Sequence, residues 1–225
     1  MHLSPILLFL TPLAAVLDWF AVATRNKPLE FFAKPAVVAL LLVWLWNQTG
    51  LIWPVGLFAC GLFFSLLGDV LLMLPEERFI PGLAAFLAAH LFYIAGFTHS
   101  MPPASLPSLV LALLIALSGW QVFVRVRSGL RAAGLERLKL PILAYSTVIG
   151  VMLFSALLTL LHDAWSAGAA LLASAGALLF FFSDCLLAWN KFVEPLKYGK
   201  LAVIVTYHVG QALITLAVAS RYGPV

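Results

Sequence analysis

The sequence predicts an all-α membrane protein whose eight transmembrane helices form a single bundle. Of its 225 residues, 64% are hydrophobic and only 10% are charged, whereas about a quarter of the residues in a soluble domain are charged. The apolar runs approach about 20 residues, the length at which a helix crosses the hydrocarbon core of a bilayer. They lack the alternation of polar and apolar residues that marks barrel strands, so helices are the predicted spanning elements.

The first half of the chain contains four apolar segments, at 5–23, 34–47, 51–74 and 81–99. The second is short and could begin near Phe31. The first segment lacks the basic residues that precede the apolar core of a signal peptide, so we expect it to be kept as a helix. The segments are separated by polar, Pro-rich or Gly-rich runs, which include NQTG (47–50), LPEERFIPG (74–82) and MPPASLPS (101–108).

The second half of the chain contains four more segments, at 106–124, 139–161, 165–189 and 200–221. The first of these has almost nothing polar before Gln121, so we expect it to face lipid. HDAW (162–165) and VEPLKYGK (193–200) separate the last three. We interpret residues 1–225 as one transmembrane domain.

The basic residues predict the orientation of the bundle. All 13 Lys and Arg residues except Arg221 fall in or beside the connections after the first, third, fifth and seventh segments. Because basic residues are retained on the cytoplasmic side of a membrane, these connections are predicted to be cytoplasmic and both termini outside. The net charge of +4 is therefore a sign of membrane topology and does not indicate nucleic-acid binding. A bacterial cytoplasmic membrane is the expected location.

The two halves of the chain resemble each other. Asp69 is followed by VLLM and Asp184 by CLLA, and a histidine follows each at similar spacing, His90 and His208. Corresponding segments open with Lys34-Pro35 and with Lys139-Leu140-Pro141. This pattern predicts two four-helix halves related by a parallel pseudo-repeat, with its axis along the membrane normal.

Asp69 and Asp184 are the candidate catalytic residues. A carboxylate inside a bilayer costs a few kcal/mol or more, so intramembrane aspartates are rare and usually functional. Each lies about five residues before the cytoplasmic end of its segment, roughly 7–8 Å deep along a helix axis. Two carboxyls at the same depth can share one cavity. Asp18, near the end of the first segment, is expected at the membrane interface instead.

Other polar residues recur at helical spacing on the same segments as the aspartates or on neighbouring ones. They predict a polar cavity in the cytoplasmic half of the bundle, ringed by Lys34, Lys191 and Lys200. Each of these residues could instead have a structural role, as a hydrogen-bonding partner or as a lysine that extends to the interface. The candidate supporting residues are His90, Tyr93, Tyr145, Tyr207, His208, Gln211 and Asn190.

No zinc, phosphate-binding or nucleophile-elbow motif occurs in the sequence, and no metal or other cofactor is predicted. Cys60 and Cys185 lie in apolar runs and indicate no disulfide framework. The motifs alone do not identify a reaction.

Longer blocks of sequence resemble the YhhN-like lysoplasmalogenase family. GDVLLMLPEERFIPGLAAFLAAHLFYIAGF (68–97) contains GD, F-x-x-G-L-x-x-F and H-x-x-Y elements that are similar to the family's first signature. FFFSDCLLAWNKF (180–192) resembles its second block, and Lys34-Pro35 and Tyr145 also fit. The resemblance implies an integral membrane hydrolase that cleaves the vinyl ether of a lysoplasmalogen to a fatty aldehyde and a glycerophospho-base.

That reaction suits the candidate residues. Protonation of the alkene gives an oxocarbenium ion, to which water adds, so one acid, one base and a nearby negative charge are needed. A buried pair of carboxyls supplies these functions much as in glycoside hydrolysis. One of Asp69 and Asp184 is then the acid and the other the base, while Lys34, Lys191 and Lys200 hold the lysophospholipid phosphate. The sequence does not decide which aspartate is the acid.

Two alternatives from other classes remain open. Parallel repeats and intramembrane aspartates also suit a proton-coupled transporter of small molecules or lipids. The second alternative is a metal-dependent hydrolase that cleaves a different lipid bond, such as an amide. Substrate lipid and membrane lipids are the expected partners, and the head group and oligomeric state are left open.

Overall fold

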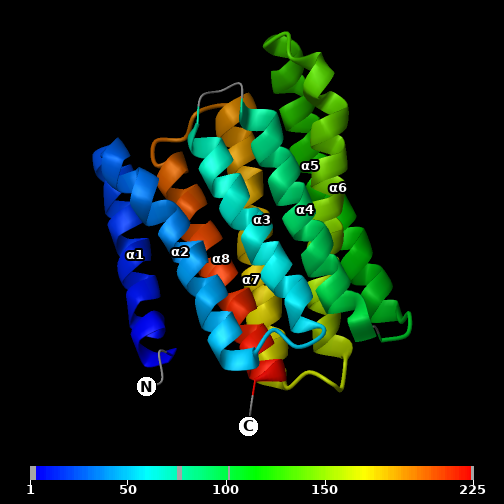
Figure 1. Ribbon diagram of the computed structural model, residues 1–225. Coiled ribbons are helices and arrows are strands. Elements are labelled where there is room, and N and C mark those ends of the chain that lie inside the picture. The colour runs from blue at the N-terminus through cyan, green and yellow to red at the C-terminus, as the bar shows by residue number, and fades with distance from the viewer. Residues whose placement is uncertain (1–3, 75–77, 101, 224–225) are drawn as a thin grey trace.

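The computed structural model describes residues 4–74, 78–100 and 102–223, and within them helices are the only regular secondary structure (Figure 1). The long helices are α1 (Ser4–Thr24), α2 (Lys27–Thr49), α3 (Val55–Met73), α4 (Phe79–Phe97), α5 (Leu106–Ala132), α6 (Lys139–Leu157), α7 (Ala167–Phe192) and α8 (Gly199–Tyr222). Short 3-10 turns η2 (Thr98–Ser100), η3 (Glu136–Leu138) and η4 (Leu158–Leu161) border α4 and α6. All eight regions are long and apolar enough to cross a membrane, which confirms the prediction of an eight-helix integral membrane protein.

Helix α2 begins at Lys27, earlier than the predicted start at 34, and the reason is its N-cap. The side chain of Asn26 accepts a hydrogen bond of 3.2 Å from the backbone N–H of Leu29, and Pro28 stands in the first turn. Both features stabilise a helix start. Gly50 then ends the helix in a left-handed conformation with φ of 63°. The early start places Lys34 inside the helix rather than at its end.

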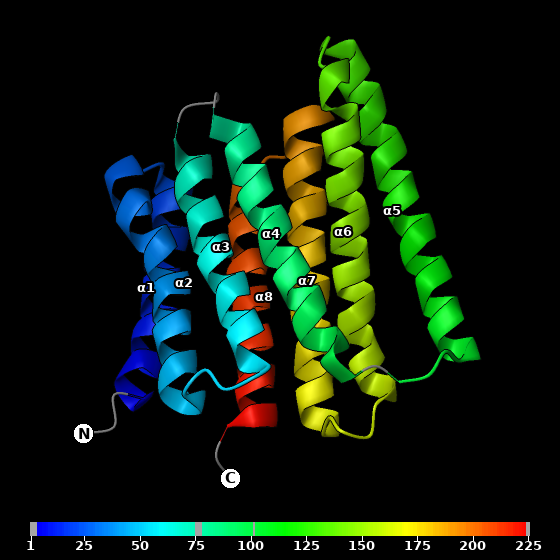
Figure 2. The same cartoon turned by 45° about the vertical axis from the view of Figure 1, so that its right-hand side comes forward.

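Helix α5 is longer than the predicted segment 106–124 and continues to Ala132. It starts with a reciprocal capping arrangement between Ser105 and Ser108. Its last turns stay helical because Phe123, Val126 and Leu130 are buried in a small apolar cluster with Ile142 and Phe192. Helices α5 and α6 therefore extend together past the other helices at one end of the bundle (Figure 2).

The helices form a bundle in which α8 is central and α5 lies at an edge (Figure 2). Helix α8 packs closely on α7 and also contacts α1, α2 and α3. A Cβ atom on Gly176 would come within 2.8 Å of the backbone oxygen of Gly210, so these glycines allow the two helices to approach closely. Only 11% of the most apolar stretch of α5 is buried, as expected for a helix that faces lipid.

The packing is compatible with two related halves. Helix α2 contacts α3 and α8, while α6 contacts α7 and α4, so the second and sixth helices occupy similar positions. Helix α1 begins and helix α8 ends at the same end of the bundle (Figure 1). The parallel pseudo-repeat itself stays a prediction.

Candidate active site

Asp184 on α7 is bonded to side chains from two other helices. The Tyr145 hydroxyl of α6 donates a short hydrogen bond to its Oδ2 atom. His90 Nε2 of α4 lies 3.3 Å from the same oxygen and 3.1 Å from the Tyr145 hydroxyl. His90 is fully buried, whereas the Asp184 side chain is 11% exposed. We call these three residues the Asp184 group. Its carboxyl is held in place yet is open to a small molecule on one side.

Asp69 on α3 has a different set of partners. Its Oδ1 atom forms an ion pair with Lys34 Nζ of α2 at 3.2 Å, and its Oδ2 atom accepts a hydrogen bond of 2.8 Å from the Tyr207 hydroxyl of α8. The Asp69 side chain is 1% exposed. We call these residues the Asp69 group. The Asp69 carboxyl is therefore enclosed and held on both oxygens by side chains from two other helices.

The ring of Phe180 separates the two groups. Its centroid lies 4.7 Å from that of His90 and 5.2 Å from that of Tyr207. Each carboxyl has its own hydrogen-bonding partners, and the fully buried Phe180 packs against one partner of each.

Tyr93 and Gln211 form a third polar group that touches neither carboxyl directly. The Tyr93 hydroxyl donates to Gln211 Oε1 at 2.7 Å, and Gln211 Nε2 donates to Ser65 Oγ at 2.9 Å. These bonds join α4, α8 and α3. Every partner is buried, so the chain of hydrogen bonds fixes the relative positions of helices that carry the two site groups.

His208 faces away from both carboxyls. Its Nδ1 atom lies 4.0 Å from Asp18 Oδ2 of α1, and it lines an apolar groove between α1, α2 and α8. Asp18 is fully buried in the packing of α1, and its predicted position at the membrane interface stays a prediction. The sequence shows only that Asp18 is near a helix end. The packing of α1 against α8 shows that it is enclosed.

Asn190 lies at the end of α7 and fixes the connection to α8. Its side-chain oxygen accepts a hydrogen bond of 2.8 Å from the backbone N–H of Leu196. A Cβ atom on Gly199 would overlap its amide group. These contacts are structural, although Asn190 also lines the cavity described next.

The three candidate phosphate-binding lysines line one cavity of about 440 Å³ at the end of the bundle where α1 joins α2 and α7 joins α8. Lys34 of α2, Lys191 of α7 and Lys200 of α8 contribute to its wall. Lys27 and Glu30, which were not candidates, line it as well and form an ion pair of 2.6 Å. We call this the lysine cavity. Its cations surround a space large enough for a phosphate group.

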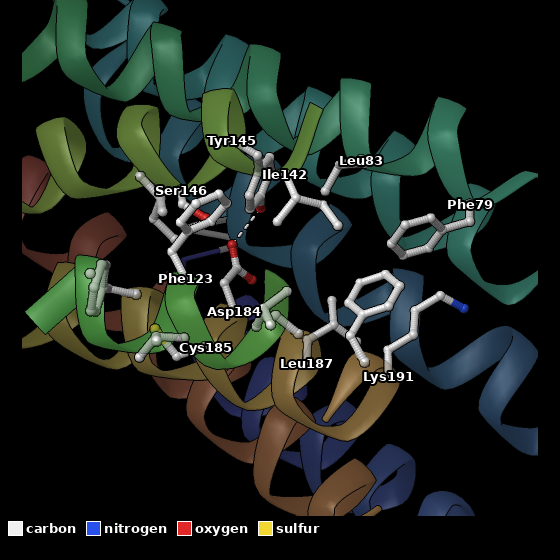
Figure 3. Close-up of a pocket in the computed structure, with 17 residues that line it drawn as sticks. Phe79, Leu83, Phe123, Ile142, Tyr145, Ser146, Asp184, Cys185, Leu187 and Lys191 are labelled. Carbon is white, nitrogen blue, oxygen red and sulfur yellow. Dashed lines mark hydrogen bonds between the residues drawn. The ribbon is translucent and has the colours of Figure 1, made fainter. Parts of the chain in front are cut away.

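A second, narrower cavity of about 50 Å³ lies beside Asp184 (Figure 3). Its other lining residues are mostly apolar and come from α4, α5, α6 and α7. Lys191 lies beside Phe79 at one end of the cavity, with its ammonium 4.5 Å from the centre of that ring. Asp184 and Tyr145 face each other further inside. Lys191 lines both cavities and so marks where they meet.

Within the part of the chain that the structure describes, no three His, Cys, Asp or Glu side chains gather in a metal-binding arrangement. Glu76 and Glu77, in the predicted connection at 74–82, lie outside the described residues.

Comparison with known proteins identifies related sequences. The sequence model of the YhhN family matches residues 29–218. Human lysoplasmalogenase TMEM86B is 32% identical over 205 residues, which cover 89% of this chain and 76% of that protein. The pig protein of the same name is 37% identical over 160 residues, 71% of this chain and 62% of its own length. Lysoplasmalogenase from Mycobacterium tuberculosis is 30% identical over 161 residues, 69% of this chain and 57% of that protein. The chain thus spans about three fifths of the length of several relatives. No solved structure matches.

Proposed function

Since the chain belongs to the YhhN family, we propose that it is a membrane hydrolase that cleaves the vinyl ether bond of a lysoplasmalogen, a 1-alkenyl lysophospholipid. Relatives from mammals and mycobacteria carry the name lysoplasmalogenase. The products are a fatty aldehyde and a glycerophospho-base. The observation that carries the proposal is the position of Asp184, in the wall of an apolar cavity that has Lys191 at its end.

Asp184 is the acid in this proposal. Its side chain lines the cavity, and Tyr145 and His90 hold one carboxyl oxygen while the other is left for a substrate. General acid catalysis requires a donor within hydrogen-bonding reach of the reacting atom. Asp69 is enclosed and paired with Lys34, which suits the ionised partner. Its negative charge favours the cation that forms during the reaction.

The reaction proceeds in three steps. Asp184 gives its proton to the alkene carbon remote from the ether oxygen, which leaves an oxocarbenium ion. Water adds to the carbon beside the oxygen, and its proton goes to the carboxylate that Asp184 has become, giving a hemiacetal and restoring the acid. The hemiacetal then breaks its bond to the glycerol oxygen, which takes the hemiacetal hydroxyl proton, and the aldehyde is released. One water is consumed in each cycle.

The lysine cavity is the proposed site for the lysophospholipid phosphate. Lys34, Lys191 and Lys200 supply ammonium groups, which bind phosphate as point charges. The end of the bundle that holds this cavity carries all the Lys and Arg residues except Arg221. By the positive-inside rule this end is cytoplasmic and both termini are outside. We place the protein in a bacterial cytoplasmic membrane, with its active site in the cytoplasmic half.

Aldehyde release from a 1-alkenyl lysophospholipid by the purified protein in detergent tests this function. Wild type and Asp163→Asn, a change at an exposed aspartate outside the long helices, are expected to release aldehyde. Asp184→Asn is expected to lose at least about a hundredfold in rate while remaining folded. Release of no aldehyde by wild type, together with movement of the intact lipid across vesicle membranes, would favour a carrier instead.

A further inference from the structure

We propose that a groove between α5 and α6 binds the alkenyl chain of the substrate and sets which chain lengths are cleaved. The inference rests on the proposed function and adds a chain-binding site to it. We call this site the chain groove. It has a volume of about 300 Å³ and is lined by Ala112, Ile115, Ala116, Gly119, Trp120, Phe123, Leu143, Ser146, Thr147, Gly150, Val151, Phe154 and Phe181.

The chain groove is continuous with the cavity at Asp184. Four residues line both: Gly119, Phe123, Ser146 and Phe181. The cavity beside the proposed acid has a volume of about 50 Å³, and the groove that adjoins it has about 300 Å³. A substrate that placed its vinyl ether beside Asp184 would therefore have its hydrocarbon chain directed into the groove.

The wall of the groove suits a hydrocarbon chain. Ala112, Ala116 and Gly119 recur at helical spacing on α5, and Ser146 and Gly150 do so on α6. These small residues leave the space between the helices open instead of filling it. Thr147, one of the two hydroxyl residues in the lining, donates to the backbone oxygen of Leu143 at 2.9 Å, so its hydrogen is already bonded. An apolar ligand fits such a surface better than water does.

The order of the sites along α7 matches the order of groups in a lysophospholipid. Lys191 and Asp184 are seven positions apart, which is two turns or roughly 10 Å along the axis. Phe181 lies about one turn beyond Asp184, on the side away from Lys191, and lines the chain groove. A phosphate near Lys191, a vinyl ether near Asp184 and a chain beyond Phe181 would thus lie parallel to the helices, as a lipid lies in a bilayer.

The groove is accessible from the membrane. Helix α5 diverges from α6 away from the tip that joins them and forms the edge of the bundle (Figure 2). Trp120, in the groove wall, is 57% exposed in the isolated chain. The chain of a lipid can therefore enter sideways between α5 and α6 without leaving the apolar phase.

Ala116 gives a direct test because it lines the groove but not the cavity at Asp184. Ala116→Phe would place a ring in the groove away from the proposed acid. We expect its kcat/KM for a long-chain (octadecenyl) lysoplasmalogen to fall about tenfold or more, and that for a short-chain (octenyl) one to stay within about twofold. Ala175→Phe is the matched control, since Ala175 is an exposed alanine of α7 that lies outside the groove. An equal fall for both chain lengths, or no change in their ratio, overturns the proposal.

A labelling experiment tests binding of the chain in the groove without requiring catalysis. A 1-O-alkyl lysophospholipid cannot be cleaved as a vinyl ether, and a diazirine in its chain labels whatever lies beside it on illumination. We expect labels on 112–123 and 143–154, reduced at least about fivefold by Ala116→Phe and unchanged by Ala175→Phe. Labels spread over all lipid-facing helices, or unaffected by Ala116→Phe, show bilayer contact only and overturn the groove. Groove labelling without aldehyde release would instead refute the proposed hydrolysis.

Discussion

The ammonium of Lys34 and the carboxylate of Asp69 lie 3.2 Å apart inside the bundle and join α2 to α3. The pair is formed because α2 begins at Lys27, which places Lys34 within a helix beside its partner. Asp69 is almost completely enclosed. Removal of one member would therefore leave a buried charge without compensation.

Lys34→Met is accordingly expected to destabilise the protein by about 3–5 kcal/mol, because Asp69 loses its counter-ion. Thermal unfolding in detergent measures the loss. Lys200→Met is the control, since Lys200 lines the same cavity but is exposed. Lys34→Met with Asp69→Leu should recover much of the stability, and failure to recover would show that the ion pair is not the cause.

Tyr145→Phe is expected to lower kcat by roughly ten- to a hundredfold, because the hydroxyl that holds Asp184 Oδ2 is lost. The phenyl ring should preserve the packing of α6, so the unfolding temperature is expected to change little. Rates of aldehyde release at saturating substrate give kcat. Tyr198→Phe, at an exposed tyrosine beside Lys197, should match wild type. A Tyr145→Phe enzyme with full kcat would mean that Asp184 is not positioned through this bond.

Lys191→Gln and Lys200→Gln are expected to raise KM about five- to fiftyfold with kcat nearly unchanged, because they remove binding to the phosphate and not to the reacting bond. Initial rates over a range of lysolipid concentrations measure both constants. Lys197→Gln removes the same charge between α7 and α8 at a residue outside the lysine cavity, and should leave KM as in wild type. If all three changes raise KM equally, the effect is one of general surface charge.

The Asp18 and His208 pair predicts separate effects on stability and activity. Asp18→Leu or His208→Leu alone is expected to lower the unfolding temperature, because each leaves the other buried polar side chain without its nearest polar neighbour. The double variant should regain most of that stability. Its aldehyde release should stay within about threefold of wild type, since neither residue is hydrogen-bonded to the Asp184 group or the Asp69 group. A stable double variant with no activity would instead include His208 in the catalytic machinery.

The fold could be predicted from the sequence more fully than the site could. Transmembrane helices follow from local hydropathy, so all eight were predicted, while the start of α2 depended on the cap at Asn26. Asp69 and Asp184 were recognisable because a carboxyl is costly in an apolar run. Their partners were not, because helical periodicity shows which residues share a face but not which helix that face meets. His90 and Tyr145 therefore meet Asp184 while His208 meets Asp18.

The position of α5 at the edge of the bundle has an evolutionary consequence. Its extensive contacts are with α6 and α7, whereas Asp69, Lys34 and Tyr207 belong to helices on the other side of the molecule. Substitutions on the inner face of α5 can change the shape of the chain groove while that ion pair and its hydrogen bond stay intact. The preference for one hydrocarbon over another can thus drift or be selected between lineages, while the residues that break the bond are kept.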